Sequence, residues 1–122
     1  MNSLSPWVDF HTHILDSPSL DEARAAAKKA HVERWLVNSV DLENESKHQA
    51  LAKKYPEAIV GVGWHPEQVI EVSASDISSV LKKFSTRVKA APYLGETGLD
   101  FLYGKTEAQQ TAQRKVFAQF IE

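Results

Sequence analysis

Two histidines at alternate positions, His11 and His13, directly follow a short apolar run at residues 7–10. Because successive side chains of a β-strand point to opposite faces, the two imidazoles project from the same face. Neutral imidazole is the commonest metal ligand among protein side chains, so the pair forms half of a candidate metal site. The alternative is two solvent-exposed histidines near an amino terminus.

Two later segments, GWHP (63–66) and GETGLDF (95–101), add further polar side chains. Between its glycines, Glu96 could bridge two divalent ions, or it could be a solvated loop glutamate. The proline after His65 holds that residue extended, and its ring could bind a substrate phosphate, a metal-bound water or a neighbouring loop. Asp100 could orient a ligand or lie in a turn.

Four apolar, β-prone runs recur along the chain, with starts about 30 residues apart, which is the spacing of βαβ units. They are residues 7–10, 35–40, 59–63 and 91–95. In parallel β/α folds, ligands bind at the carboxyl ends of the strands. We therefore expect His11, His13, His65 and Glu96 to converge at one mouth.

Helix signals fill the intervals between these runs. The first predicted helix follows a capping box at Ser19 and has a stripe of alanines at 23, 26, 27 and 30. The second runs from Asp41 to about Tyr55 and the third starts at Ser73 or Ser75. The fourth runs from about Thr106 to the end of the chain. No linker interrupts this array, and we expect one domain over residues 1–122.

The length of 122 residues is about half of what a closed eight-stranded barrel needs. We therefore expect an α/β fold that forms the N-terminal half, about (βα)4, of a TIM-type (β/α)8 barrel, as a fragment or a truncated product. Such a half has an unpaired parallel edge where the next strand should be. A complete small open-sheet protein is the alternative.

The composition, with 43% hydrophobic and 25% charged residues, is that of a globular chain and not of a disordered or membrane protein. The absence of cysteine excludes disulfides and thiolate ligands and agrees with a cytoplasmic location. The amino terminus has no secretory signal pattern. A net charge of −2 excludes a strongly basic surface, so a nucleic acid would need a local cationic patch or bound metal.

The remaining histidines and tryptophans have simpler interpretations. His31 is expected at the carboxyl end of the alanine-rich helix, and His48 to be solvated in a charged helix. Trp7, Trp35 and Trp64 are expected to pack, with Trp64 near enough to the mouth to touch substrate.

Taken together, VDFHTH (8–13), VGWHP (62–66) and LGETGLDF (94–101) resemble the TatD family of metal-dependent deoxyribonucleases, within the amidohydrolase-like barrel superfamily. The motifs match in order and spacing, and the resemblance extends over the whole chain, as the first half of a typical member.

The resemblance implies that His11 and His13 bind one divalent ion, Mg²⁺, Mn²⁺ or Zn²⁺, and that Glu96 bridges it to a second. His65 would contact the substrate, and a metal-activated water would attack a DNA phosphodiester. Family members supply two further histidines and an aspartate from later strands, whereas this chain has no histidine after His65. We therefore expect the isolated chain to be weakly active or inactive.

Two other functions stay open at this point. A related amidohydrolase would cut a C–N or lactone bond, but many of these bridge their metals with a modified lysine, and no lysine follows a predicted strand here. A non-catalytic remnant would instead associate with another chain through its open sheet edge.

Overall fold

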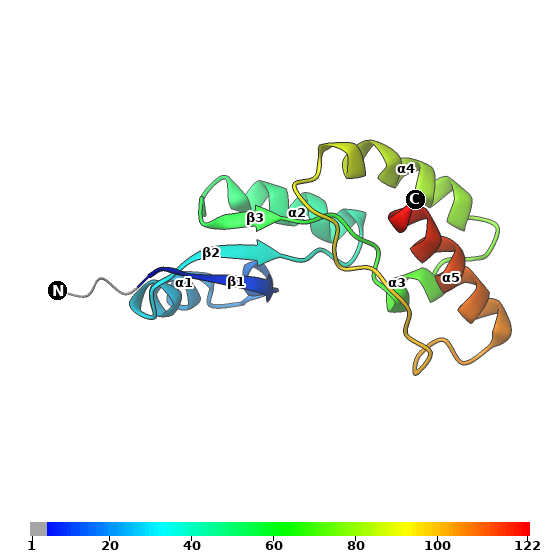
Figure 1. Cartoon of the computed structure of the whole chain (residues 1–122), viewed down its shortest axis with the longest axis horizontal. Coiled ribbons are helices and arrows are strands. Elements are labelled where there is room, and N and C mark those ends of the chain that lie inside the picture. Colours follow the sequence, from blue (N-terminus) through cyan, green and yellow to red (C-terminus); the bar gives the residue numbers. More distant parts are fainter. Residues whose placement is uncertain (1–4) are drawn as a thin grey trace.

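The computed structural model describes residues 5–122 of the chain, in which short parallel strands alternate with helices (Figure 1). The elements in chain order are β1 (Trp7–Thr12), the 3-10 turn η1 (Ile14–Asp16), α1 (Leu20–Lys29), β2 (Val32–Val37), α2 (Leu42–Ala52), β3 (Ala58–Val60), α3 (Pro66–Ile70), α4 (Ile77–Ala90) and α5 (Glu107–Ile121). Among these described helices, none has the length and apolar character needed to cross a membrane. The predicted α/β fold class is confirmed.

The sheet is parallel and has the order β1-β2-β3, with β2 in the middle. The predicted fourth strand, residues 91–95, forms only a single parallel bridge between Val62 and Leu94. Two backbone hydrogen bonds support it, from Val62 N–H to Tyr93 (3.3 Å) and from Gly95 N–H to Val62 (2.9 Å). Pro92 has no N–H to donate, which limits pairing along this run. The order of the predicted (βα) units is kept all the same.

Two hydrophobic clusters divide the core. The first surrounds β2 and consists of Leu15, Trp35, Val37 and Val60. The second joins α3, α4 and α5, which lie together at the end of the molecule away from the amino terminus (Figure 1), and consists of Val62, Trp64, Val69, Ile77, Phe84, Val116 and Phe120. The prediction that Trp35 and Trp64 pack in the core is confirmed.

The edge strand β1 lies outside both clusters. Trp7 is 67% exposed and Phe10 is 73% exposed, so the prediction that Trp7 packs in the core is wrong. The cause is the position of β1, because it pairs only with β2 among the described strands and α1 packs against β2. Apolar side chains on β1 therefore face solvent.

Two of the predicted helix starts have the side-chain cap that the sequence suggests, and one does not. Asp41 caps α2, since its side chain accepts from Asn44 N–H, and Thr106 caps α5 in a full capping box. Ser19 precedes α1 as predicted, but its side chain makes no capping bond, so the predicted box is wrong there. In α1 no residue is fully buried, and the alanine stripe is at best half-buried. Helix α4 begins after Asp76, slightly later than predicted, and the short α3 was not predicted.

Candidate metal centre

Backbone hydrogen bonds from the residues that follow β2 connect the ends of the neighbouring strands. Asn38 N–H donates to the carbonyl of Thr12 (3.1 Å), at the end of β1. The carbonyl of Val40 accepts from His65 N–H (2.8 Å), and the carbonyl of Ser39 accepts from Glu96 N–H (2.9 Å). Residues 38–40 thus join the three segments that carry the predicted site residues, at the carboxyl edge of the sheet where such sites form.

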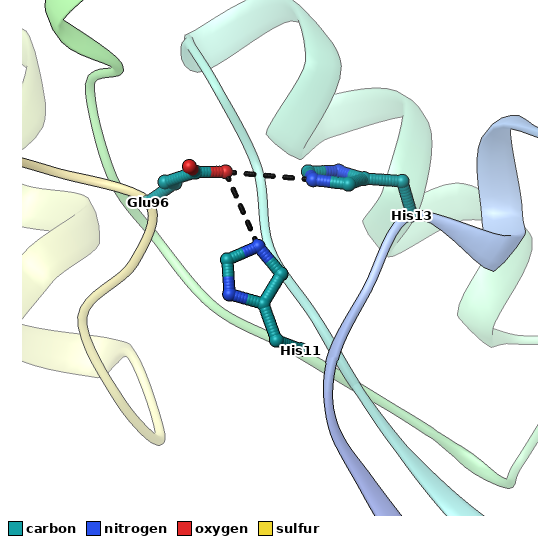
Figure 2. A group of neighbouring side chains, drawn as sticks. All are labelled: His11, His13 and Glu96. Atoms are coloured by element: carbon teal, nitrogen blue, oxygen red, sulfur yellow. Dashed lines mark ion pairs between the residues drawn. The ribbon is translucent and has the colours of Figure 1, made fainter.

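His11, His13 and Glu96 point toward one another from these segments (Figure 2). The Nε2 atom of His11 lies 3.5 Å from Glu96 Oε2, and that of His13 lies 3.4 Å from the same oxygen. One ligand atom from each of the three residues lies within 4.8 Å of the other two. The two histidines meet on one face because they alternate along the chain, as the sequence predicts.

This donor set fits a divalent ion. With metal–nitrogen and metal–oxygen bonds of about 2.0–2.2 Å, neighbouring ligands of a tetrahedral ion lie about 3.3–3.6 Å apart, which matches both nitrogen–oxygen separations. Imidazole with carboxylate suits Zn²⁺ and Mn²⁺, and a carboxylate also suits Mg²⁺. The side chains of His11 and His13 are 60% and 43% exposed, which leaves the solvent side open to water or substrate.

His65 contacts the other oxygen of the same carboxylate. Its Nδ1 accepts from Glu67 N–H at the start of α3 (3.2 Å), and its Nε2 lies 3.3 Å from Glu96 Oε1. Since Nδ1 accepts, Nε2 carries the proton in the neutral ring and faces the Glu96 carboxylate. With the proton on Nε2, His65 contacts the carboxylate and offers no free lone pair there for a metal ion. The side chain of His65 is 21% exposed, so it lies at the rim of the cluster formed by His11, His13 and Glu96.

Gly63 allows the Glu96 segment to approach so closely. A Cβ atom at this position would overlap the backbone nitrogen and carbonyl oxygen of Glu96 and the carbonyl carbon of Gly95. Any larger residue would therefore displace the segment that carries the carboxylate. The peptide bond between Gly95 and Glu96 is cis.

Asp100, the other candidate, lies in a turn. Its Oδ1 accepts from Leu102 N–H (2.9 Å) and Tyr103 N–H (3.4 Å). Its backbone N–H and carbonyl both bond to the buried side chain of Gln113 on α5, each at 2.9 Å. These contacts correspond to the turn alternative of the sequence analysis.

His31 lies where the sequence predicts, at the carboxyl end of α1, with a φ of 58° and its N–H bonded to the carbonyl of Lys28. Trp64 does not reach the mouth, because it is buried and its ring stacks on Phe84 with centroids 5.4 Å apart. The prediction that Trp64 could touch substrate is therefore wrong.

His48 is fully buried, so the prediction that it is solvated is wrong. Its ring nitrogens bond to Ser39 Oγ (3.0 Å) and Asp16 Oδ2 (2.9 Å). Burial is tolerated because both nitrogens have partners. The burial of His48 was not predicted because its neighbours in the sequence are charged. No spacing pattern in the sequence connects His48 to Asp16 or Ser39.

Comparison with known proteins gives a consistent result. The family model of TatD-related DNases matches residues 8–122. The crystal structure of YJJV, a TatD homologue from Escherichia coli K12, is similar with a TM-score of 0.69 and 25% identity, covering 94% of this chain and 45% of that chain. A TatD family hydrolase from Entamoeba histolytica has the same TM-score at 17% identity, covering 93% and 46%. The chain thus spans slightly under half the length of these structures. No curated protein matches it.

Proposed function

The chain belongs to the TatD-related DNase family, and from this premise we propose that it is the metal-binding half of a divalent-metal-dependent hydrolase that cleaves DNA phosphodiester bonds. The observation that supports this most directly is the Glu96 carboxylate, which meets His11 and His13 through one oxygen and His65 through the other. We also propose that residues 1–122 form one partial barrel domain and that the protein is located in the cytoplasm.

Each side chain has a separate role in this proposal. His11 and His13 would hold one divalent ion, Mg²⁺, Mn²⁺ or Zn²⁺, and Glu96 would supply the carboxylate that the resemblance to the family assigns to a second ion as well. A bound ion supplies a water of lowered pKa and neutralises the charge that develops on a phosphate. Without substrate, His65 contacts the Glu96 carboxylate through Nε2. When a substrate phosphate binds at the rim, it takes the place of this carboxylate and accepts a hydrogen bond from Nε2–H. This chain supplies only part of the metal ligands expected for the complete family site, so we propose that it has weak or no catalytic turnover when it is alone.

Metal binding and DNA cleavage test this proposal separately. Calorimetry should detect a divalent ion bound by the wild-type chain, and a double variant with His11→Ala and His13→Ala should lose it. His31→Asn is the matched control, because it removes a histidine remote from the site and asparagine tolerates the positive φ found there.

Cleavage of labelled single-stranded DNA should be weak with the 122-residue chain and strong with a chain extended by further barrel strands. In both, cleavage should require metal and both histidines. Metal affinity that survives the double variant would contradict the proposed ligands. An extended chain that binds metal and does not cut DNA would contradict the substrate and favour the amidohydrolase alternative.

The sequence analysis expects association at the edge where the next strand would follow residues 91–95; we propose instead that the chain self-associates through β1, the edge strand on the other side of the described sheet. Three apolar side chains of this edge strand, Trp7, Val8 and Phe10, are exposed, and an unpaired edge of this kind is a template for another strand. Sedimentation over a range of concentrations should show dimers or larger species. Phe10→Lys should shift them to monomer, and a monomer at all concentrations would contradict the proposal.

A further inference from the structure

The buried histidine on α2 lies at the centre of a hydrogen-bonded chain that the proposed metal chemistry does not use. Its Nδ1 is 3.0 Å from Ser39 Oγ, and its Nε2 is 2.9 Å from Asp16 Oδ2. The second oxygen of Asp16 accepts from Lys47 Nζ (2.9 Å) and Asn44 Nδ2 (3.2 Å). We refer to Asp16, His48 and Ser39 as the α2 network.

One end of the α2 network is attached to His13. Asp16 is the last residue of η1, which begins directly after His13, and its backbone N–H donates to the carbonyl of His13 (2.8 Å). A displacement of Asp16 would therefore shift the backbone of His13, a predicted metal ligand.

The other end is attached to Glu96. The carbonyl of Ser39 accepts from Glu96 N–H (2.9 Å), and Ser39 N–H donates to the carbonyl of Gly95 (3.4 Å). The side chain that bonds to His48 thus belongs to the residue that pairs with the carboxylate-bearing segment. His48 joins the two segments that supply opposite parts of the ligand set.

Charge fixes the direction of the hydrogen bonds in this chain. Burial alone would raise the pKa of Asp16, but hydrogen bonds from Lys47 and His48 and the positive charge of Lys47 lower it below its ordinary value. Asp16 is therefore ionised at neutral pH and only accepts, so Nε2 of His48 donates to it. In the neutral ring, Nδ1 then accepts from the hydroxyl of Ser39.

We propose that His48 is a positioning residue, which sets the separation between His13 and Glu96 through Asp16 and Ser39. Partners of this kind typically change metal affinity about 10–100-fold when they are lost. The inference rests on the proposed metal site for its effect on affinity, whereas the geometric coupling stands on the hydrogen bonds alone.

Two variants and a matched control test it. Ser39→Ala removes one end of the α2 network, and His48→Gln keeps a donor that can reach Asp16 but loses the bond to Ser39. Ile77→Ala is the control, because it removes buried volume in the cluster of α3, α4 and α5, away from the network. All measurements are made at a temperature at which circular dichroism shows each variant to be folded.

The first readout is amide exchange at Glu96 and Asp16 without metal. We expect both network variants to exchange the Glu96 amide roughly fivefold faster or more, corresponding to one loosened hydrogen bond, while the control exchanges like the wild type. Wild-type exchange at Glu96 in both network variants would overturn the proposal.

The second readout is the dissociation constant for Zn²⁺ from calorimetry. We expect about tenfold weaker binding in Ser39→Ala and His48→Gln and unchanged binding in Ile77→Ala. Equal weakening in all three would overturn the positioning role, because it would reflect stability alone. A wild-type chain that binds no Zn²⁺, Mn²⁺ or Mg²⁺ would contradict the proposed function, and the exchange readout would then decide the coupling by itself.

Discussion

β1 and β2 are neighbouring strands of six residues with one tryptophan each, yet their surroundings differ completely. Trp35 on β2 is 1% exposed in the first core cluster, and Trp7 on β1 is 67% exposed. The difference between the two tryptophans follows the places of their strands, because β2 is central in the described sheet and β1 lies at its edge. The candidate site spans this division, because His11 and His13 belong to the exposed side whereas Glu96 and His65 are held by the packed side.

The largest expected effect comes from truncating the two tryptophans. Trp35→Ala should lower the free energy of unfolding by about 3–5 kcal/mol, because it leaves a cavity in the core. At concentrations at which the chain is a monomer, Trp7→Ala should change it by less than about 0.5 kcal/mol, as surface substitutions usually do. Urea unfolding of both variants measures the difference, and equal losses would show that β1 is as well covered in solution as β2.

A smaller effect is expected where the packed side meets the site. Gly63→Ala should cost about 1–3 kcal/mol of stability through overpacking against the Glu96 backbone and weaken metal binding about tenfold. Gly104→Ala is the control, since its new methyl group would press on the buried side chain of Gln113 and the backbone carbonyl of Asp100, which lie away from the ligands. Unchanged metal affinity in Gly63→Ala would mean that the packed side does not hold Glu96 in place.

The two sides also differ in how their helices begin. Thr106→Ala should cost about 1 kcal/mol, because it removes the capping box of α5. Ser19→Ala should cost almost nothing, because the Ser19 side chain makes no capping bond to α1. Thermal unfolding of the two variants is sufficient to measure this, and a loss at Ser19 as large as at Thr106 would contradict the described start of α1.

The smallest effect concerns pH. The folded-state pKa of Asp16 is lowered from 3.8, so its contribution to stability is fully present above that value and is lost as the pH falls below it. The difference in unfolding free energy between wild type and Asp16→Asn should therefore be constant near neutral pH and shrink below 3.8. The effect is small because a third of the Asp16 side chain (32%) is exposed. A difference that grows on acidification would contradict the lowered pKa.

Local patterns in the sequence were sufficient for much of the fold and for the geometry of the predicted ligands. Apolar runs located the three strands, and the alternation of His11 and His13 placed both imidazoles on one face. The rule that sites form at carboxyl ends of parallel strands brought Glu96 and His65 to the same place. The roles of these residues in metal and substrate binding remain predictions.

Where the sequence analysis was wrong, the deciding contacts lie far apart in the chain. His48 is surrounded by charged neighbours in sequence, but Asp16 and Ser39 reach it from η1 and from the end of β2. Trp7 resembles Trp35 locally, and only its place at the sheet edge exposes it. Ser19 and Thr106 both begin capping-box patterns, and a pattern alone does not show whether the backbone lets the side chain reach.

The position of His13 and Glu96 in the chain has a consequence for folding. An ion held by these residues would act as a cross-link that closes a loop containing α1 through α4. Closing a loop of this length removes conformational entropy from the unfolded chain worth on the order of 4 kcal/mol. Metal occupancy and melting temperature would then rise together. The ion would thus attach β1, through His13, to the packed side of the molecule that carries Glu96. The exposed apolar side chains of β1 do not provide such an attachment.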